Sequence, residues 1–247
     1  MTQENPDSSP YSEQQLGTFQ TLVDIVDKLR SPGGCPWDIE QTHSSLKRNL
    51  LEECYEVLEA IDGGGGKALS EELGDLLVQV AFHANIASQA GEFQLADVLS
   101  HINRKLVRRH PHVFGEESRD KSADQQTRDW EAVKARERAA KGASGVLDDV
   151  AVGLPALLRA VKLQKRAARV GFDWPDASHV LDKITEEAGE LREAAETLPH
   201  EKVEEEFGDL LMVLVNVGRW LGVNAEDALR QANGRFTRRF AEMERLA

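Results

Sequence analysis

Two acidic segments of the chain share one pattern of residues that could bind a divalent metal ion. In the first segment the carboxylates belong to Glu52, Glu53, Glu56, Glu71, Glu72 and Asp75. In the second they belong to Glu186, Glu187, Glu190, Glu205, Glu206 and Asp209, each 134 residues after its counterpart. Oxygen ligands without histidine favour Mg²⁺, or Mn²⁺ in its place, over zinc. The pattern therefore predicts a tandem duplication with a metal-binding helix hairpin in each copy.

An α-helix would place the acidic residues of the second copy along the edge of an apolar stripe. At about 100° per residue, Glu187 and Glu190 fall together on one helix, and Glu206 and Asp209 fall together on the next. If the two helices pack antiparallel, these carboxylates converge and repel one another unless a cation lies between them. The predicted metal ligands are Glu187, Glu190, Glu206 and Asp209, and the second candidate site is Glu53, Glu56, Glu72 and Asp75.

Two other interpretations of the acidic pattern are weaker. Charged residues on a helix face are usually only solvated, but solvation does not require two copies with unchanged spacing. A di-iron bundle needs Glu-x-x-His on two helices, and no histidine stands three positions after any of these glutamates.

Trp37 and Trp174 each precede an acidic helix. Packing at the start of the helix is the favoured role of these two tryptophans, and lining a base pocket is the alternative.

Composition excludes several classes of partner. The formal net charge is −13, from 43 acidic and 30 basic residues, so binding to nucleic acid or to an anionic membrane surface is not expected. The apolar runs are too short to span a bilayer, and the first ten residues contain no apolar signal core. The two cysteines have no zinc-binding spacing. We expect a cytoplasmic protein that is neither exported nor embedded in a membrane.

Helical periodicity dominates the chain and predicts an all-α fold of tandem helical-bundle domains. The predicted helices span about 12–29, 42–61, 68–89 and 95–109 in the first copy, and 155–170, 178–197, 201–220 and 225–246 in the second. The predicted domains are 12–118 and 150–247, joined by a partly helical linker at 119–149. Apolar residues exceed what one hairpin can bury, so we expect a homodimer with four-helix-bundle packing.

Several motifs together resemble one protein family. They are GCPWD at residues 34–38, RRHPHVFG at residues 108–115, GFDW at residues 171–174 and both acidic pairs. From about residue 15 onward the chain resembles the MazG family of nucleoside triphosphate pyrophosphohydrolases, in the all-α NTP pyrophosphatase superfamily. The resemblance implies tandem helical domains, a homodimer, Mg²⁺ dependence, and hydrolysis of nucleoside triphosphates to monophosphate and pyrophosphate with broad base tolerance.

The resemblance also implies roles for individual residues. In two-domain members of the family the C-terminal copy is the active one, and Glu187, Glu190, Glu206 and Asp209 match its metal ligands. The matching triphosphate contacts are Lys183, Lys202, Arg235 and Arg239, and we add Arg238 from the same segment as a candidate.

The two copies differ in the basic residues beside their carboxylates. Lys183 stands one turn before Glu187, and Lys202 one turn before Glu206, where substrate phosphates would lie. Their counterparts in the first copy are Asn49 and Ala68, so that copy is predicted to hydrolyse slowly or not at all.

The predicted reaction is attack of water on the α-phosphorus with pyrophosphate as the leaving group. Either Glu186 or Glu205 is a candidate base that orients the water. The predicted catalytic residues are Glu186, Glu187, Glu190 and Glu205.

Three alternatives stay open at this point. A base-selective relative, such as a dUTPase-like or phosphoribosyl-ATP pyrophosphohydrolase, would share the metal site. A helical regulator could bind metal and nucleotide without hydrolysis. A pure dimerisation scaffold is the weakest alternative, because it does not require the carboxylate spacing.

Overall fold

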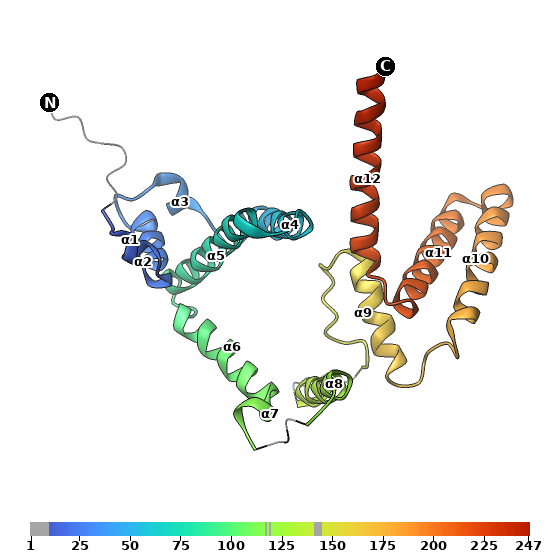
Figure 1. The fold of residues 1–247 in the computed structure, drawn as a ribbon, viewed down its shortest axis with the longest axis horizontal. Helices are drawn as coiled ribbons and strands as arrows, with labels where there is room; N and C mark the ends of the chain where they lie inside the picture. The colour runs from blue at the N-terminus through green and yellow to red at the C-terminus, as the bar shows by residue number, and fades with distance from the viewer. Residues whose placement is uncertain (1–9, 117, 119, 141–144) are drawn as a thin grey trace. The chain divides into compact units, whose positions relative to one another are not determined.

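The computed structural model describes residues 10–116, 118, 120–140 and 145–247, and all regular structure in these ranges is helical (Figure 1). The predicted all-α class is therefore confirmed. The chain divides into two compact units, one ending at Ala123 and the other beginning at Asp124. None of the described helices is long and apolar enough to cross a membrane.

The first unit is built around the helix pair α4 and α5. Its helices are α1 (Glu13–Leu16), α2 (Phe19–Arg30), α3 (Pro36–Glu40), α4 (Lys47–Asp62), α5 (Gly66–Gln89), α6 (Leu95–Arg109) and α7 (Pro111–Phe114). Helix α2 packs on α5, where Val26, Leu46, Ala81 and Phe82 form a buried apolar cluster. Glycines 64, 65 and 66 close the turn between α4 and α5 with positive φ angles, a conformation that favours glycine.

The second unit repeats the helix pair. Its helices are α8 (Ala123–Ala140), α9 (Ala156–Ala168), α10 (Ala177–Thr197), α11 (His200–Trp220) and α12 (Ala225–Leu246). Helices α10 and α11 pack together through a short turn at Leu198 and Pro199, and α9 packs against α11. Helix α12 contacts α9 and α11 and then extends beyond them (Figure 1).

Helix α8 falls within the segment that was predicted as a partly helical linker. The Glu131 carboxylate on α8 lies 2.7 Å from the Arg169 guanidinium at the end of α9. Lys134 lies over the ring of Trp130 at 3.7 Å from the ring centroid. The Glu131–Arg169 pair joins α8 to the rest of the second unit, whereas the Lys134–Trp130 contact lies within α8. Residues 141–144 of the predicted linker lie outside the described ranges.

The structure corrects two predicted helices of the first copy. The single helix predicted over 12–29 is wrong, because Gly17 and Thr18 separate α1 from α2 and Thr18 caps α2 by accepting the Thr21 N–H at 3.1 Å. The helix predicted from residue 42 begins at Lys47, since Thr42 and Ser45 bond each other's backbone N–H groups and form a turn instead.

Two short helices were not predicted from the sequence. Helix α3 and helix α7 each start with a proline, a residue that suits the first turn because its missing N–H would be unpaired there. Both are too short to produce a clear periodic signal, and α3 lies in the GCPWD motif that leads to α4.

Candidate metal and phosphate site

Helices α10 and α11 bring three carboxylates together in the second unit. Glu187 and Glu190 on α10 and Glu206 on α11 offer oxygen atoms that all lie within 4.8 Å of one another. Glu187 is only 6% exposed, whereas its two partners are more accessible. Asp209 follows Glu206 by one turn on α11 but is not part of this group. The structure therefore assembles three of the four predicted ligands.

Lys183 supplies a positive charge at the edge of this cluster. Its Nζ lies 2.8 Å from Glu186 Oε1 and 2.9 Å from Glu187 Oε1. Hydrogen bonds to Glu186 and then Glu187 raise the pKa of Lys183, so the ammonium stays charged at neutral pH. The spacing of one helical turn makes these contacts possible, because residues three and four apart share a face.

Lys202 makes a similar but more exposed pair on α11. Its Nζ lies 2.5 Å from Glu205 Oε2, and this hydrogen bond raises the pKa of Lys202. The two candidate bases, Glu186 and Glu205, are thus each paired with a lysine. Both lysines stand beside carboxylates of the cluster, where they can bind anionic oxygens.

Loss of hydration and neighbouring negative charge act together on Glu190. Loss of hydration raises its pKa first, the Glu187 charge raises it further, and Lys183 opposes both effects. Glu206 and Glu186 add to the increase in the pKa. A carboxylate whose charged form is disfavoured by its neighbours is stabilised when a cation joins the group.

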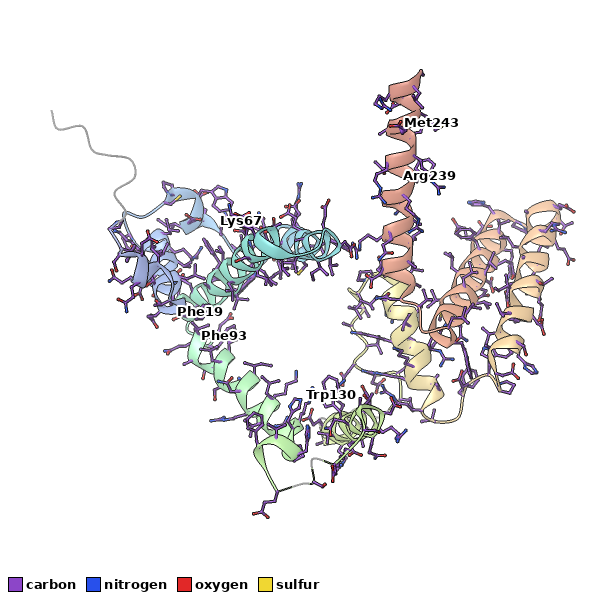
Figure 2. All side chains as sticks on the ribbon, in the orientation of Figure 1. Phe19, Lys67, Phe93, Trp130, Arg239 and Met243 are labelled. Carbon is purple, nitrogen blue, oxygen red and sulfur yellow. The ribbon has the colours of Figure 1, made fainter. Side chains whose placement is uncertain are left out.

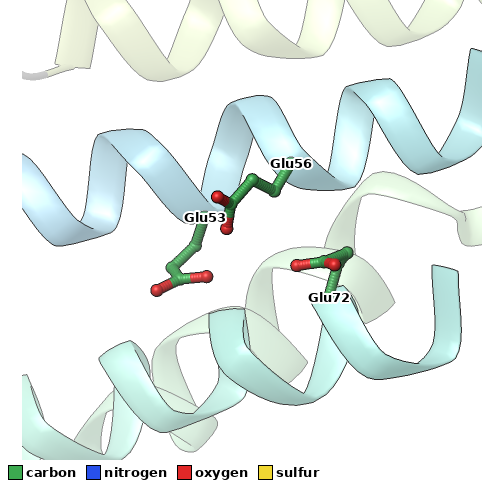
Figure 3. Close-up of side chains that lie close together, drawn as sticks. All are labelled: Glu53, Glu56 and Glu72. Carbon is green, nitrogen blue, oxygen red and sulfur yellow. The ribbon is translucent and has the colours of Figure 1, made fainter. Parts of the chain in front are cut away.

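The first unit contains a matching cluster on α4 and α5. Figure 3 shows Glu53 and Glu56 reaching from α4 toward Glu72 on α5, and their oxygens lie within 4.8 Å of one another. The pKa of Glu53 is raised by loss of hydration first and then by the charge of Asp75, so the fourth predicted residue acts on this cluster as well. Among the described residues, these two clusters are the only groups of three or more candidate ligands.

The first cluster differs from the second in its basic neighbours. Arg48 pairs with Glu52 at 2.7 Å, and Lys67 pairs with Glu71 at 3.3 Å. The charged groups that shift the pKa of Glu53 are all acidic, whereas the ammonium of Lys183 is among those that act on Glu190. The second cluster alone thus has an ammonium group among its carboxylates within the described residues.

Three predicted phosphate contacts lie on α12 rather than on the two helices that carry the cluster. Figure 2 shows Arg239 on the part of α12 that extends beyond α9 and α11. Arg235 and Arg238 belong to the same helix, and Phe236, Phe240 and Met243 beside them are exposed. The arginines are therefore contributed by a different helix from the carboxylates of Glu187 and its partners.

One pair of functional interest was not predicted. The Arg219 guanidinium on α11 donates two hydrogen bonds to the Asp173 carboxylate of the GFDW motif, one of them at 3.0 Å. These bonds lower the pKa of Asp173. The motif was noticed in the sequence, but Arg219 stands 46 residues away and no spacing rule links the two.

Comparisons with known proteins agree with this geometry. A model of the "MazG nucleotide pyrophosphohydrolase domain" matches residues 41–114 and again residues 176–243. The chain is 49% identical over 228 residues to the nucleoside triphosphate pyrophosphohydrolase/pyrophosphatase MazG of Thermotoga maritima, covering 92% of this chain and 86% of the relative.

Two further relatives bear the same activity in their names. The nucleoside triphosphate pyrophosphohydrolase of Escherichia coli is 48% identical over 234 residues, which cover 94% of this chain and 89% of that protein. The one from Mycobacterium tuberculosis is 47% identical over 171 residues, covering 67% of this chain and 50% of that protein. Each family match contains one of the two carboxylate clusters.

Proposed function

The chain belongs to the MazG nucleotide pyrophosphohydrolase family, and we propose that it hydrolyses nucleoside triphosphates to monophosphate and pyrophosphate in its second unit. The observation that carries this assignment is the group of three carboxylates at Glu187, Glu190 and Glu206 with Lys183 beside it. The reaction adds one water across the bond between the α- and β-phosphates. Broad base tolerance, cytoplasmic action and the absence of nucleic-acid partners are part of the proposal.

The second cluster fits a hard divalent cation. Its donors are carboxylate oxygens only, and the pKa of Glu190 is raised by loss of hydration first and then by the negative charge of Glu187. The proposed ligands of Mg²⁺, or of Mn²⁺ in its place, are Glu187, Glu190, Glu206 and Asp209. When bound, the ion would neutralise phosphate oxygens and lower the pKa of a bound water.

The basic side chains are proposed to bind the triphosphate tail. Lys183 and Lys202 lie beside the cluster and would donate hydrogen bonds to the phosphate oxygens distant from the sugar. Glu186 and Glu205 hold these ammonium groups in place. Once a lysine turns to phosphate, its glutamate is released to accept a proton from the attacking water.

We propose that the chain acts as a homodimer with four-helix-bundle packing. Large apolar side chains are exposed on α11 and α12, including Phe207, Leu214, Phe236 and Phe240. A soluble protein rarely leaves such faces open, so a second copy would cover them. The same assembly would carry Arg235, Arg238 and Arg239 toward a carboxylate cluster.

Product analysis tests the proposed function. The full chain is incubated with Mg²⁺ and each of several nucleoside triphosphates, and the products are separated by chromatography. Equal amounts of nucleoside monophosphate and pyrophosphate are expected from most of the panel. Strict use of one base would indicate a selective relative, and nucleotide binding without any product would indicate a regulator; either result contradicts the proposal.

A matched pair of variants identifies the working cluster. Glu190→Gln removes one charge from the second cluster, and Glu56→Gln makes the same change at the corresponding position of the first. Turnover should be abolished by the former and largely kept by the latter. The reverse result would place the reaction in the first unit.

A further inference from the structure

Two histidines of the first unit lie against each other close to the start of α4. His43 belongs to the turn that precedes α4, and His83 lies on α5, 40 residues later. Their Nδ1 atoms are 2.7 Å apart, and their rings are stacked, with centroids 5.0 Å apart and planes 8° from parallel. Neither histidine belongs to a carboxylate cluster, so the proposed reaction does not account for the pair.

A contact of this length requires a hydrogen bond between the two rings. One Nδ1 carries a hydrogen and donates it, and the other Nδ1 accepts it. The pair tolerates a first added proton, because a charged ring can still donate to a neutral one. A second added proton places a hydrogen on both Nδ1 atoms. The bond is then lost, and two positive rings face each other.

Burial makes the second added proton still less favourable. His83 is half-buried, and its Nε2 is buried with no hydrogen-bond partner among the described residues. Loss of hydration lowers the pKa of His83 first, and the charge of His43 lowers it further. The ring of His83 is therefore the one that stays neutral while the two rings are in contact.

The elements packed against α5 carry other titratable or charged groups, namely Asp27 and Arg30 on α2, Lys47 and Arg48 on α4, and Asp97 and His101 on α6. Asp27 and Arg30 both bond Asn85, which lies on a different face of α5 from His83. Of the charged groups in the part of the chain that the structure describes, His43 is the one that shifts the pKa of His83. The titration of His83 thus depends mainly on its burial and on its partner.

The pair holds a turn on which the start of α4 depends. Leu46, the N-cap residue of α4, has no side-chain acceptor for the first N–H groups of the helix. Its side chain is 2% exposed and packs in the cluster that contains Phe82, the neighbour of His83 on α5. The imidazole contact and this apolar packing together fix the turn on α5.

The second unit starts the first helix of its hairpin in a different way. Helix α10 begins at Ala177 behind the side-chain cap of Asp176. At the offset of 134 residues, Val217 corresponds to His83. Valine does not ionise and buries no polar atom, so the first unit bears a burial cost that the second avoids. Such a cost is expected where a histidine is used for its titration near neutral pH.

We propose that His43 and His83 form a pH-sensitive latch, which holds the start of α4 on α5 at neutral pH and opens when both rings are protonated. Because the pKa of His83 is lowered in the folded protein, its contribution to stability is complete above the ordinary histidine pKa. This contribution is lost as the pH falls through the lowered pKa of His83. The latch acts within the first unit and does not depend on the proposed function.

Hydrogen exchange of the full chain, followed by mass spectrometry at about pH 7.5 and about pH 5.5, tests the latch. An imidazole that is charged only in the open form favours opening about tenfold for each pH unit below its ordinary pKa. After correction for the intrinsic effect of pH on exchange, protection of residues 42–50 should therefore fall about tenfold at the lower pH. Helix α9, which contains no histidine, should keep its protection.

A matched pair of variants separates His83 from the other histidines. Glutamine does not ionise but can still donate a hydrogen bond to His43 Nδ1, so protection of residues 42–50 in His83→Gln should hardly change between the two pH values. His101→Gln makes the same change at an exposed histidine of α6 and should keep the fall seen in the wild type. An equal fall in the wild type and in His83→Gln, or no fall in the wild type, would overturn the latch.

NMR titration of the wild-type imidazoles gives an answer that needs no variant. His83 should stay neutral until the pH falls below the ordinary histidine pKa, and the two rings should titrate as a coupled pair in two steps. If His43 and His83 instead titrate independently, both at the ordinary histidine pKa, the rings do not share a proton and the latch is excluded.

Discussion

The ammonium group of Lys183 distinguishes two otherwise similar carboxylate clusters. In the second unit it lies 2.9 Å from Glu187, whereas Asn49 occupies the corresponding position of the first unit. Three acidic side chains at short range repel one another, and a neighbouring cation offsets part of that cost. The same cation can then bind a phosphate oxygen of a substrate. Its presence therefore bears both on the charge balance of the free protein and on the proposed reaction.

Replacing Lys183 tests its proposed role in phosphate binding. Lys183→Met keeps a long side chain but removes the charge, and kcat/KM for a nucleoside triphosphate should fall about 100-fold or more. Steady-state pyrophosphate release measures the effect. Lys67→Met removes an exposed lysine of the first unit and serves as the control, and an equal loss in both variants would contradict the assignment.

Metal removal gives a second prediction at the same scale. A chelator should abolish pyrophosphate release by the wild-type chain, and added Mg²⁺ should restore it. If both clusters bind the ion, Glu56→Gln should reduce the number of ions bound in calorimetry while turnover persists. Activity that survives chelation and dialysis would refute the metal site.

The carboxylate clusters were predictable because duplication preserved their spacing. Glu187, Glu190 and Glu206 follow a pattern that a helical wheel places on neighbouring edges, and the structure brings them together. The bond between Asp173 and Arg219 was not predictable, since its partners come from a loop and a distant helix turn. The family resemblance read from the motifs is confirmed by the relatives.

At the scale of elements, capping decides where several helices begin. Asp176 accepts hydrogen bonds from the N–H groups of Ser178 and His179 at 2.9 and 3.2 Å, and α10 starts immediately afterward. Thr18 does the same for α2. Periodicity in the sequence predicted most helix interiors, but it did not locate the break at Gly17 or the turn at Thr42, because these depend on local side-chain hydrogen bonds.

Loss of the α10 cap is expected to destabilise the second unit modestly. Asp176→Ala should lower the unfolding free energy of the second unit, because the N–H groups of Ser178 and His179 lose their acceptor. Thermal or urea unfolding measures the cost. Asp182→Ala changes an acidic residue inside the same helix and is the control; a larger loss in that variant would argue against the cap.

The same substitution should alter the titration of His179. The pKa of His179 is raised because its imidazole bonds the Asp176 carboxylate at 2.8 Å. The pair therefore stabilises the folded protein fully at pH values below the ordinary histidine pKa. This stabilisation is lost as the pH rises through the raised pKa of His179. In Asp176→Ala the pKa of His179 should fall toward its usual value. NMR titration of the imidazole protons checks this, and an unchanged pKa would exclude the ion pair.

At the scale of the whole molecule, each unit exposes apolar side chains that its own helices do not cover. In the second unit Phe236, Phe240 and Met243 line α12, and Phe207 lies on α11. Faces of this kind usually mark an interface. Dimerisation through these faces stays a prediction.

Charge placed on α12 should oppose the proposed dimer. The double variant Phe236→Asp with Phe240→Asp buries unfavourable charge in an apolar interface, so light scattering should show the wild type at twice the chain mass and the variant near the mass of one chain. Thr237→Asp adds a charge at a polar position of the same helix and should leave the dimer intact. A wild-type chain that is monomeric at micromolar concentration would refute the prediction.

The turns that close the two hairpins differ in stiffness. Glycines 64, 65 and 66 join α4 to α5, whereas Leu198 and Pro199 join α10 to α11. Proline fixes the backbone angle φ, whereas glycine allows the widest range of backbone conformations. The turn of the second hairpin therefore loses less conformational entropy than the glycine turn of the first when the two helices are held at one separation. The proline-closed hairpin is accordingly preorganised, and less of its binding free energy is lost to ordering when an ion and a nucleotide arrive.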